Sequence, residues 1–221
     1  MRIAALYDIH GNLPALEAVL AEVEREGVEH VVAGGDLLSQ PFALECLDRL
    51  RALGDAVTFV RGNADVGQEP ALAEAVAGWP LTVELDVDGL GRVLFCHGSP
   101  RSNEEILTRI SPDERVTEAL AGVEANLLVC GHTHVQFDRV AGGRRLVNAG
   151  SVGLPYEGRP GAFWALLGPG VELRRTEYDV EPMIAALEAV GDPAALDRVG
   201  WLRDPPDPDE VSAYFESQVG A

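Results

Sequence analysis

The stretch Ile3-Ala4-Ala5-Leu6-Tyr7-Asp8-Ile9-His10-Gly11-Asn12 carries the signal that decides the fold of this chain. Its apolar first half predicts a buried strand, which stops at an aspartate and a histidine, two residue types that bind metals. Asn12 can cap a helix, and the apolar residues of segment 13–26 recur with helical spacing. The stretch therefore predicts a strand, a polar loop and a helix, in that order.

Four further apolar runs also end at residues that can bind a metal. They stop at Gly35-Asp36, Gly62-Asn63, His97 and Gly131-His132-Thr133-His134. In open α/β sheets, ligands bind at the carboxyl ends of the strands, so we expect the five loops to meet. Their mixed nitrogen and oxygen ligands suit Mn²⁺, Fe²⁺, Zn²⁺, Co²⁺ or Ni²⁺ rather than Ca²⁺ or Mg²⁺. Seven ligands exceed the need of one ion, and a carboxylate that bridges two ions would account for the number.

Each motif alone also has a structural explanation. Asp8 can cap a helix beside a surface histidine, and Asp36 and Asn63 both suit turns. His97 can be an ordinary loop residue. Gly131-His132-Thr133-His134 is the most specific piece, because imidazoles spaced i, i+2 share one face of an extended segment. Five such motifs, each after an apolar run, favour a metal centre over five separate accidents.

The predicted elements alternate up to about residue 80. Predicted strands cover 3–7, 30–33 and 56–60, and predicted helices cover 13–26 and 42–53, the second with Leu44, Leu47, Leu50 and Leu53 on one side. This alternation predicts a parallel sheet with helices packed against it.

The pattern changes after residue 80. Pairs of strand-like runs around glycine-rich turns predict hairpins over 81–96, 135–147 and 162–178, with a helix near 113–120 and a strand over 126–130. These elements predict a second, largely antiparallel sheet packed on the first. We expect one domain over 1–221, with a helical tail from about 180 that has helices near 181–190 and 207–218.

The composition excludes several classes of function. The chain has 36 acidic and 17 basic residues and a formal net charge of −19, which argues against nonspecific binding to DNA or RNA. Its three cysteines, Cys46, Cys96 and Cys130, form no CxxC pair, so we expect no structural disulfide and a reducing compartment. No apolar stretch approaches the ~20 residues of a transmembrane helix. We therefore expect a cytoplasmic protein without a membrane partner.

The order of the five motifs resembles that of the calcineurin-like metallophosphoesterase superfamily. The segments Asp8-Ile9-His10-Gly11-Asn12-Leu13 and Asn148-Ala149-Gly150-Ser151-Val152-Gly153 are similar to its YfcE-like small phosphodiesterase branch. The resemblance implies an α/β fold, a two-sheet αββα sandwich with mixed sheets flanked by helices. It also implies a phosphodiesterase that hydrolyses a small phosphate ester, such as a nucleotide or a cyclic nucleotide.

Carried over position by position, the resemblance implies a ligand set for two divalent transition-metal ions. Asp8, His10 and His134 would hold the first ion; Asn63, His97 and His132 would hold the second; and Asp36 would bridge them. Mn²⁺ is the first choice, with Fe, Zn, Ni or Co as alternatives. A hydroxide that bridges the ions at the Asp36 site would attack phosphorus in line, so no protein nucleophile is required.

One position departs from the pattern of many superfamily members. They carry a histidine after the Gly-Asn motif that protonates the leaving group, whereas this chain has Ala64, as the YfcE-like branch commonly does. The change puts efficient hydrolysis of poor leaving groups in doubt. Asp65 is expected to orient Asn63 or its loop rather than to act as the acid.

Four residues outside the ligand set are candidates for binding the substrate: Asn12, Arg61, Ser99 and Arg101. Each also has a plainer explanation. Asn12 is expected to cap the first helix, Arg61 and Arg101 could form surface ion pairs, and Ser99 could be a turn residue.

Three other functions remain open. The enzyme alternatives are a phosphomonoesterase and a phosphatase that acts on proteins or dinucleotide polyphosphates. Phosphoprotein phosphatases carry an arginine shortly after the Gly-Asp motif and after the Asn-His pair, and this chain lacks both arginines. A metal-binding scaffold is an alternative from a different class.

The C-terminal helices, with Trp201, Tyr214 and Phe215, would either cover the core or form the contact of a homodimer.

Overall fold

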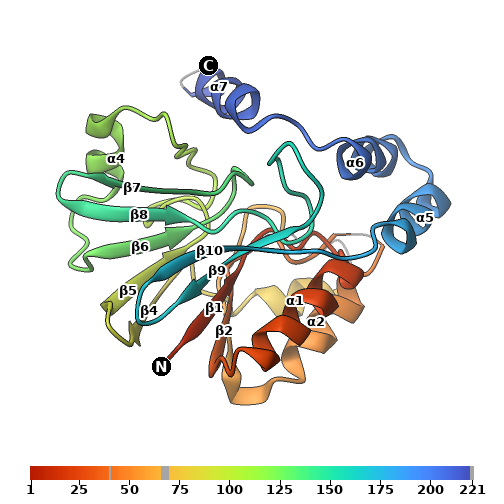
Figure 1. Cartoon of the computed structure of the whole chain (residues 1–221), viewed down its shortest axis with the longest axis horizontal. Helices are drawn as coiled ribbons and strands as arrows, with labels where there is room; N and C mark the ends of the chain where they lie inside the picture. Colours follow the sequence, from red (N-terminus) through yellow and green to blue (C-terminus); the bar gives the residue numbers. More distant parts are fainter. Residues whose placement is uncertain (40, 66–69, 220–221) are drawn as a thin grey trace.

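Two five-stranded sheets lie face to face in the computed structural model of this protein, which describes residues 1–39, 41–65 and 70–219 (Figure 1). Helices cover the outer side of each sheet, so the layers run helix, sheet, sheet, helix. The expected αββα sandwich with mixed sheets is confirmed. The loops at the carboxyl ends of its strands carry the predicted ligands.

The first sheet has the strand order β10-β9-β1-β2-β3. Its strands are β1 (Ile3–Leu6), β2 (His30–Ala33), β3 (Val57–Phe59), β9 (Ala162–Leu167) and β10 (Val171–Thr176). The first three are parallel, as the alternating pattern predicts, whereas β9 is antiparallel to β1 and β10 is antiparallel to β9. Placing this hairpin in the second sheet was wrong. β9 is buried along its whole length, as a strand between two neighbours is.

The second sheet has the strand order β4-β5-β6-β8-β7. Its strands are β4 (Thr82–Val87), β5 (Gly91–Cys96), β6 (Leu127–Cys130), β7 (Phe137–Ala141) and β8 (Arg144–Asn148). The hairpins β4–β5 and β7–β8 are present, but β5, β6 and β8 run parallel. A largely antiparallel sheet was therefore the wrong expectation. The reason is the crossover between β5 and β6, which contains a helix and returns the chain in the same direction.

The helices lie outside the sheets and along the tail. They are α1 (Leu13–Arg25), α2 (Ala43–Arg51), α3 (Pro70–Val76), α4 (Asp113–Ala119), α5 (Glu181–Val190), α6 (Pro193–Arg203) and α7 (Pro208–Gln218), with a 3-10 turn η1 (Gly54–Ala56). The sequence patterns did not predict α3 or α6. In α6 only Ala195, Val199 and Leu202 are buried, which leaves a weak helical pattern. Among the described residues, no helix is long and apolar enough to cross a membrane.

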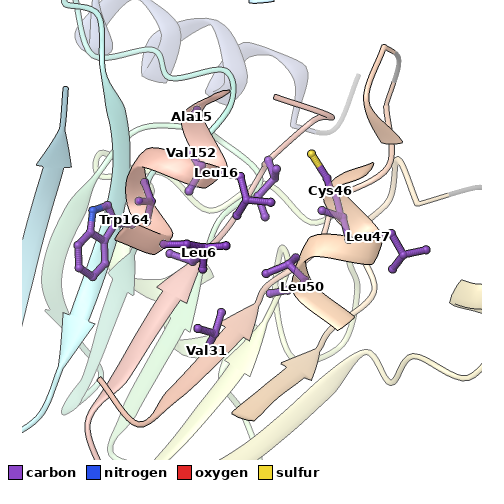
Figure 2. Close-up of a cluster of buried hydrophobic side chains, with 14 of the residues drawn as sticks. Leu6, Ala15, Leu16, Val31, Cys46, Leu47, Leu50, Val152 and Trp164 are labelled. Carbon is purple, nitrogen blue, oxygen red and sulfur yellow. The ribbon is translucent and has the colours of Figure 1, made fainter. Parts of the chain in front are cut away.

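Two apolar layers fix the first sheet. Its outer face packs on α1 and α2 through a cluster that includes Leu6, Leu16, Leu47, Leu50 and Trp164 (Figure 2). Leu44 points out of this cluster and is 44% exposed, so only part of the expected leucine stripe of α2 is buried. The inner face packs on the second sheet. Both sheets are therefore rigid supports for the loops at their ends.

Candidate metal centre

Hydrogen bonds tie the strand-end loops to one another. The Asp8 N–H donates to the Gly35 carbonyl at 3.1 Å, and the Gly131 N–H donates to the His97 carbonyl at 2.9 Å. The Ser151 hydroxyl donates to the Asp8 carbonyl at 2.8 Å. These bonds join loops from both sheets, so residues far apart in sequence meet at one end of the sandwich.

The backbone of these loops is strained where the ligands are predicted. Among the described residues, five that are not glycine have a positive φ, and all five belong to the predicted ligand set: Asp8, His10, Asp36, His132 and His134, with φ between 47° and 69°. Left-handed conformations of this kind cost free energy and persist where function requires them. This strain is an observation independent of residue type that marks the same site.

Two glycines permit the loops to approach closely. A Cβ added at Gly62 would lie 2.1 Å from Oδ1 of Asp36, and one added at Gly131 would lie 2.5 Å from Oδ2 of Asp8. Both distances are shorter than real carbon contacts. The glycines of the motifs are therefore needed for space around the carboxylates.

The first group of ligating atoms comes from Asp8, His10 and His134, whose ligand atoms all lie within 4.8 Å of one another. Nε2 of His10 lies 3.1 Å from Nε2 of His134, and the latter lies 3.2 Å from Oδ1 of Asp8. The Nδ1 of His134 donates to the Leu154 carbonyl at 2.6 Å, which directs Nε2 into the centre.

The second group comes from Asp36, His97 and His132, again within 4.8 Å. His97 donates from Nδ1 to the Gly34 carbonyl at 3.0 Å, so its Nε2 faces the centre. That nitrogen lies 3.1 Å from Oδ1 of Asn63. The structure therefore brings all seven predicted ligand residues together around two neighbouring positions.

Asp36 lies between the two groups. Its Oδ2 is 3.4 Å from Nε2 of His97 in the second group and 4.0 Å from Nε2 of His10 in the first. Its Oδ1 accepts a hydrogen bond from the Ala64 N–H at 2.7 Å, which fixes the orientation of the carboxylate.

The donor set fits divalent metal ions. Oδ1 of Asp8 is fully buried and has no hydrogen-bond partner among the described residues, although it faces three imidazoles. A buried carboxylate oxygen of this kind is unfavourable unless a cation is close. The opposed Nε2 atoms of His10 and His134 likewise call for a proton or an ion between them.

The carboxylates and imidazoles shift one another's pKa values. Burial works to lower the pKa of His97, but the carboxylates of Asp8 and Asp36 outweigh it and raise that pKa to about 9. Burial, with the neighbouring imidazoles, lowers the pKa of His10 and of His132 to about 4. The pKa of the Asp36 carboxyl is lowered, since the hydrogen bond to His97 and its charge outweigh burial. Near neutral pH, these shifts favour ionised carboxylates at Asp8 and Asp36, a protonated His97, and neutral rings at His10 and His132.

Asp65 supports the loops rather than facing the centre. Its carboxylate is buried and accepts hydrogen bonds from the N–H groups of Asp36, Leu37, Leu38 and Gly62, at 2.9 to 3.1 Å. It therefore joins the loop of Asp36 to the loop of Asn63. This arrangement agrees with the expectation that Asp65 orients its loop.

Three of the four predicted substrate-binding residues are engaged in local structure. Asn12 caps α1 by accepting from the Ala15 N–H, and its amide donates to the Gly153 carbonyl and to Tyr178. The Ser99 hydroxyl accepts from two backbone N–H groups of its own turn. Arg101 is exposed and pairs with Glu105 and Glu118, and no hydrogen bond or ion pair joins it to the ligand groups within the described residues.

Arg61 differs from these three. It lines a cavity of about 450 Å³ together with Asn63, Asp65 and Asn103. Within the described part of the chain, its guanidinium makes no hydrogen bond or ion pair. It is therefore the one predicted substrate-binding residue with a free cationic group beside a ligand loop.

The sequence patterns missed the residues that reach the centre from outside the motifs. Tyr156 stacks on His134 at 4.7 Å between ring centroids, and the ring of Phe215 lies 6.4 Å from that of His132. Arg198 of α6 donates to the His10 carbonyl. Phe215 and Arg198 belong to the tail, where no motif marks them, and only the tertiary fold brings them to the site.

Comparisons with known proteins agree with the geometry. The family described as the calcineurin-like phosphoesterase superfamily domain matches residues 1–167. Phosphodiesterase YfcE of Escherichia coli is 28% identical over 177 residues, which cover 75% of this chain and 87% of that protein. An uncharacterized protein of Methanocaldococcus jannaschii is 27% identical over 222 residues, covering 81% of this chain and 88% of its own length.

A solved structure shares the fold over nearly the whole chain. The metallophosphoesterase of Sphaerobacter thermophilus superposes with a TM-score of 0.75 at 26% identity, covering 90% of this chain and 99% of that one. The likeness therefore extends into the tail, beyond the residues that the family match covers.

Proposed function

Since the chain belongs to the calcineurin-like phosphoesterase superfamily, we propose that it is a phosphodiesterase that hydrolyses a small phosphate ester, a nucleotide or a cyclic nucleotide, with two divalent metal ions. The observation that carries the proposal is the position of Asp36, whose Oδ2 lies 3.4 Å from His97 of one group and 4.0 Å from His10 of the other. The similarity to Phosphodiesterase YfcE supports the preference for a diester.

In this proposal each group holds one ion. Asp8, His10 and His134 hold the first; Asn63, His97 and His132 hold the second; and Asp36 contacts both. Two such ions supply an activated water and neutralise the phosphoryl oxygens during in-line displacement. We expect both ions to be Mn²⁺, since the nitrogen and oxygen ligands suit it, with Fe, Zn, Ni or Co as alternatives.

Arg61 supports binding of the phosphate. Arg61 lines the cavity that Asn63 also lines, and its guanidinium forms no ion pair with a described carboxylate. Guanidinium groups bind phosphate through paired N–H donors, so we expect Arg61 to hold a phosphate oxygen. Arg101 is a weaker candidate, because Glu105 and Glu118 already pair with it.

The presence of Ala64 after the Gly-Asn motif favours substrates with good leaving groups. The residue contributes only its backbone N–H, to Asp36, so it offers no acid that could protonate a departing alkoxide. General acid catalysis typically contributes about 10²- to 10⁴-fold. We therefore expect fast hydrolysis of aryl esters and slower hydrolysis of alkyl esters.

The first assay compares bis-p-nitrophenyl phosphate with p-nitrophenyl phosphate, using protein that has been stripped of metal and reloaded with Mn²⁺. We expect metal-dependent hydrolysis that favours the diester. Preference for the monoester would support a phosphomonoesterase instead. An absence of turnover with metal bound would support the scaffold alternative.

The matched variant for this assay is Asp36→Asn, which keeps the size of the side chain and removes its charge. We expect it to bind less Mn²⁺, measured by elemental analysis after gel filtration, and to lose turnover. Full activity in Asp36→Asn would contradict the role of Asp36 between the ions.

Homodimer formation and a cytoplasmic location stay predictions.

A further inference from the structure

Two consecutive helices of the tail, α6 and α7, have residues near the candidate metal centre. The family match ends at residue 167, so α6 and α7 lie outside it. Figure 1 shows the tail running from α5, beside α1, past α6 to α7 over the end of the sandwich. Each of the two helices has contacts with a different ligand group.

The helix α6 is attached at the first ligand group. Arg198 donates to the carbonyl of His10, and Trp201 lies edge-on to Tyr156, which in turn stacks on His134. The remaining inward residues of α6 pack with α5 and Leu154 in an apolar cluster. The contacts of α6 are thus largely explained by docking the tail onto the domain.

The helix α7 is attached differently. Of its described residues only Ser212 is buried, so apolar packing contributes little to its position. Instead Glu216 accepts hydrogen bonds from Thr108, Ser111 and Arg115, at 2.6 Å in each case. This polar clamp holds α7 beside the second ligand group.

The clamp places one aromatic ring outside the apolar core. Phe215 is half-buried and belongs to none of the apolar clusters of the core. Its ring lies edge-on to that of its exposed neighbour Tyr214, at 6.0 Å between centroids, and 6.4 Å from that of His132, tilted by 45°. An apolar ring held by polar contacts beside a metal ligand is arranged to contact something that is bound there.

We propose that Phe215 is a specificity residue that contacts an aromatic group of the phosphate ester while the phosphate occupies the metal centre. The inference rests on the proposed function for the position of the phosphate. Because an aromatic side chain stacks on planar rings and offers no strong hydrogen bond, it selects a ring rather than a particular pattern of donors. The substrate class is therefore a phosphate ester that carries a nucleobase or an aryl group.

Binding is tested first, without hydrolysis. Phenylphosphonate and methylphosphonate carry the same anionic group and differ in the ring, and neither is an ester. Calorimetric titration of the Mn²⁺-loaded protein should give a lower Kd for phenylphosphonate, by about fivefold or more. Phe215→Ala should abolish this preference, and Phe215→Leu should retain only part of it.

The control variant is Leu196→Ala, which also shortens an apolar side chain of the tail. Leu196 is 50% exposed on α6 and has no ring contact with the ligand groups. We expect Leu196→Ala to keep the preference for phenylphosphonate. Equal preference in wild type and Phe215→Ala would overturn the inference. So would a change in Mn²⁺ affinity alone, since Phe215 would then only shield the metal.

Kinetics separate the two sources of the ring. Methyl p-nitrophenyl phosphate, bis-p-nitrophenyl phosphate and thymidine 5′-p-nitrophenyl phosphate share one leaving group and differ in the group retained on phosphorus. We expect Phe215→Ala to reduce the ratio of KM for the methyl ester to KM for an aromatic ester. A reduction for the thymidine ester identifies a nucleoside, and a reduction for the aryl ester alone identifies an aryl group.

The two proposals can fail separately. Preference for phenylphosphonate that depends on Phe215, in a protein that hydrolyses none of the esters, would support the inference and contradict the phosphodiesterase. Hydrolysis with no dependence of the ratio on Phe215 would support the phosphodiesterase and overturn the inference.

Discussion

His97 is the imidazole of the candidate centre whose pKa is raised. Asp8 and Asp36 raise its pKa to about 9, whereas the pKa values of His10 and His132 are lowered to about 4. At pH 7, these values leave one of the three imidazoles protonated in the metal-free protein. A metal requires the neutral ring, so a metal and a proton would compete at His97.

We therefore predict that the association constant for Mn²⁺ rises about tenfold per pH unit between pH 7 and pH 9, and levels off above it. Calorimetry in buffers of different ionisation enthalpy should detect release of about one proton at pH 7. His97→Asn keeps an oxygen ligand and should release none. An uptake of protons, or equal release in the variant, would contradict the assignment.

Asp65 offers a second prediction at the scale of one side chain. Each of its oxygens accepts two backbone N–H groups, so the amide nitrogen of Asp65→Asn would meet two donors and leave them unsatisfied. We expect a loss of about 2–3 kcal/mol in the free energy of unfolding, measured by urea denaturation in chelator. Asp55→Asn, an exposed carboxyl on η1, is the control and should change little. Unchanged stability in Asp65→Asn would show that the loops hold without it.

The meeting of the candidate ligand residues could be predicted because each follows an apolar run, and the runs are the strands. Asp8, Asp36 and His97 were identified in this way, without any knowledge of the pairing between strands. The contacts of Tyr156, Arg198 and Phe215 could not, because they arise only when the tail folds back over the loops. Local pattern thus finds the candidate ligands and misses the residues that border them.

At the scale of elements, periodicity predicted β1, α1 and β2 closely and hairpin partners less well. The hairpin β9–β10 pairs with β1 across more than 150 residues of sequence, and no local pattern encodes that choice. The parallel order of β5, β6 and β8 follows from crossovers whose direction the turns alone do not reveal. Local signals therefore predict which segments form strands and helices. Which strands pair with each other depends on how each strand is buried on its two faces.

The attachment of α7 through Glu216 predicts a local response. The carboxyl interacts with Arg115, Ser111 and Thr108, which outweigh burial and lower its pKa. A lowered pKa in the folded state means that the carboxylate stabilises the protein above its unfolded pKa and loses this effect as pH falls. Glu216→Gln at pH 7, and the wild type at a pH below the lowered pKa of Glu216, should therefore release α7.

Hydrogen exchange measures this release. We expect the amides of α7 to exchange faster in Glu216→Gln, while those of β1 and β9 stay protected. Glu210→Gln changes an exposed carboxyl of the same helix and should leave the exchange unaltered. Faster exchange throughout the chain would instead mean that α7 supports the whole fold.

At the scale of the molecule, the metal should stabilise a strongly acidic protein. The formal net charge is −19, and buried Asp8 and Asp36 lie together at the centre. Mn²⁺ at 100 times its Kd should add about 2.7 kcal/mol to the free energy of unfolding. For a chain of this size, that corresponds to an increase in Tm of about 5–10 °C.

Thermal scans of the stripped and the Mn²⁺-loaded protein check this prediction. Salt at equal ionic strength controls for screening of the surface charge, which also stabilises an acidic chain. Asp36→Asn should show a smaller increase than the wild type. An equal increase in the variant would assign the effect to the surface rather than to the centre.

A laboratory selection for heat resistance alone would act against the five left-handed residues around the two groups. Their conformations cost about 1–3 kcal/mol each, and glycine would relieve every one of them. Glycine would also delete the side chain of a proposed metal ligand each time. Directed evolution in chelator would thus select variants that are more heat-resistant but inactive. Only a screen for turnover in every round would retain the activity.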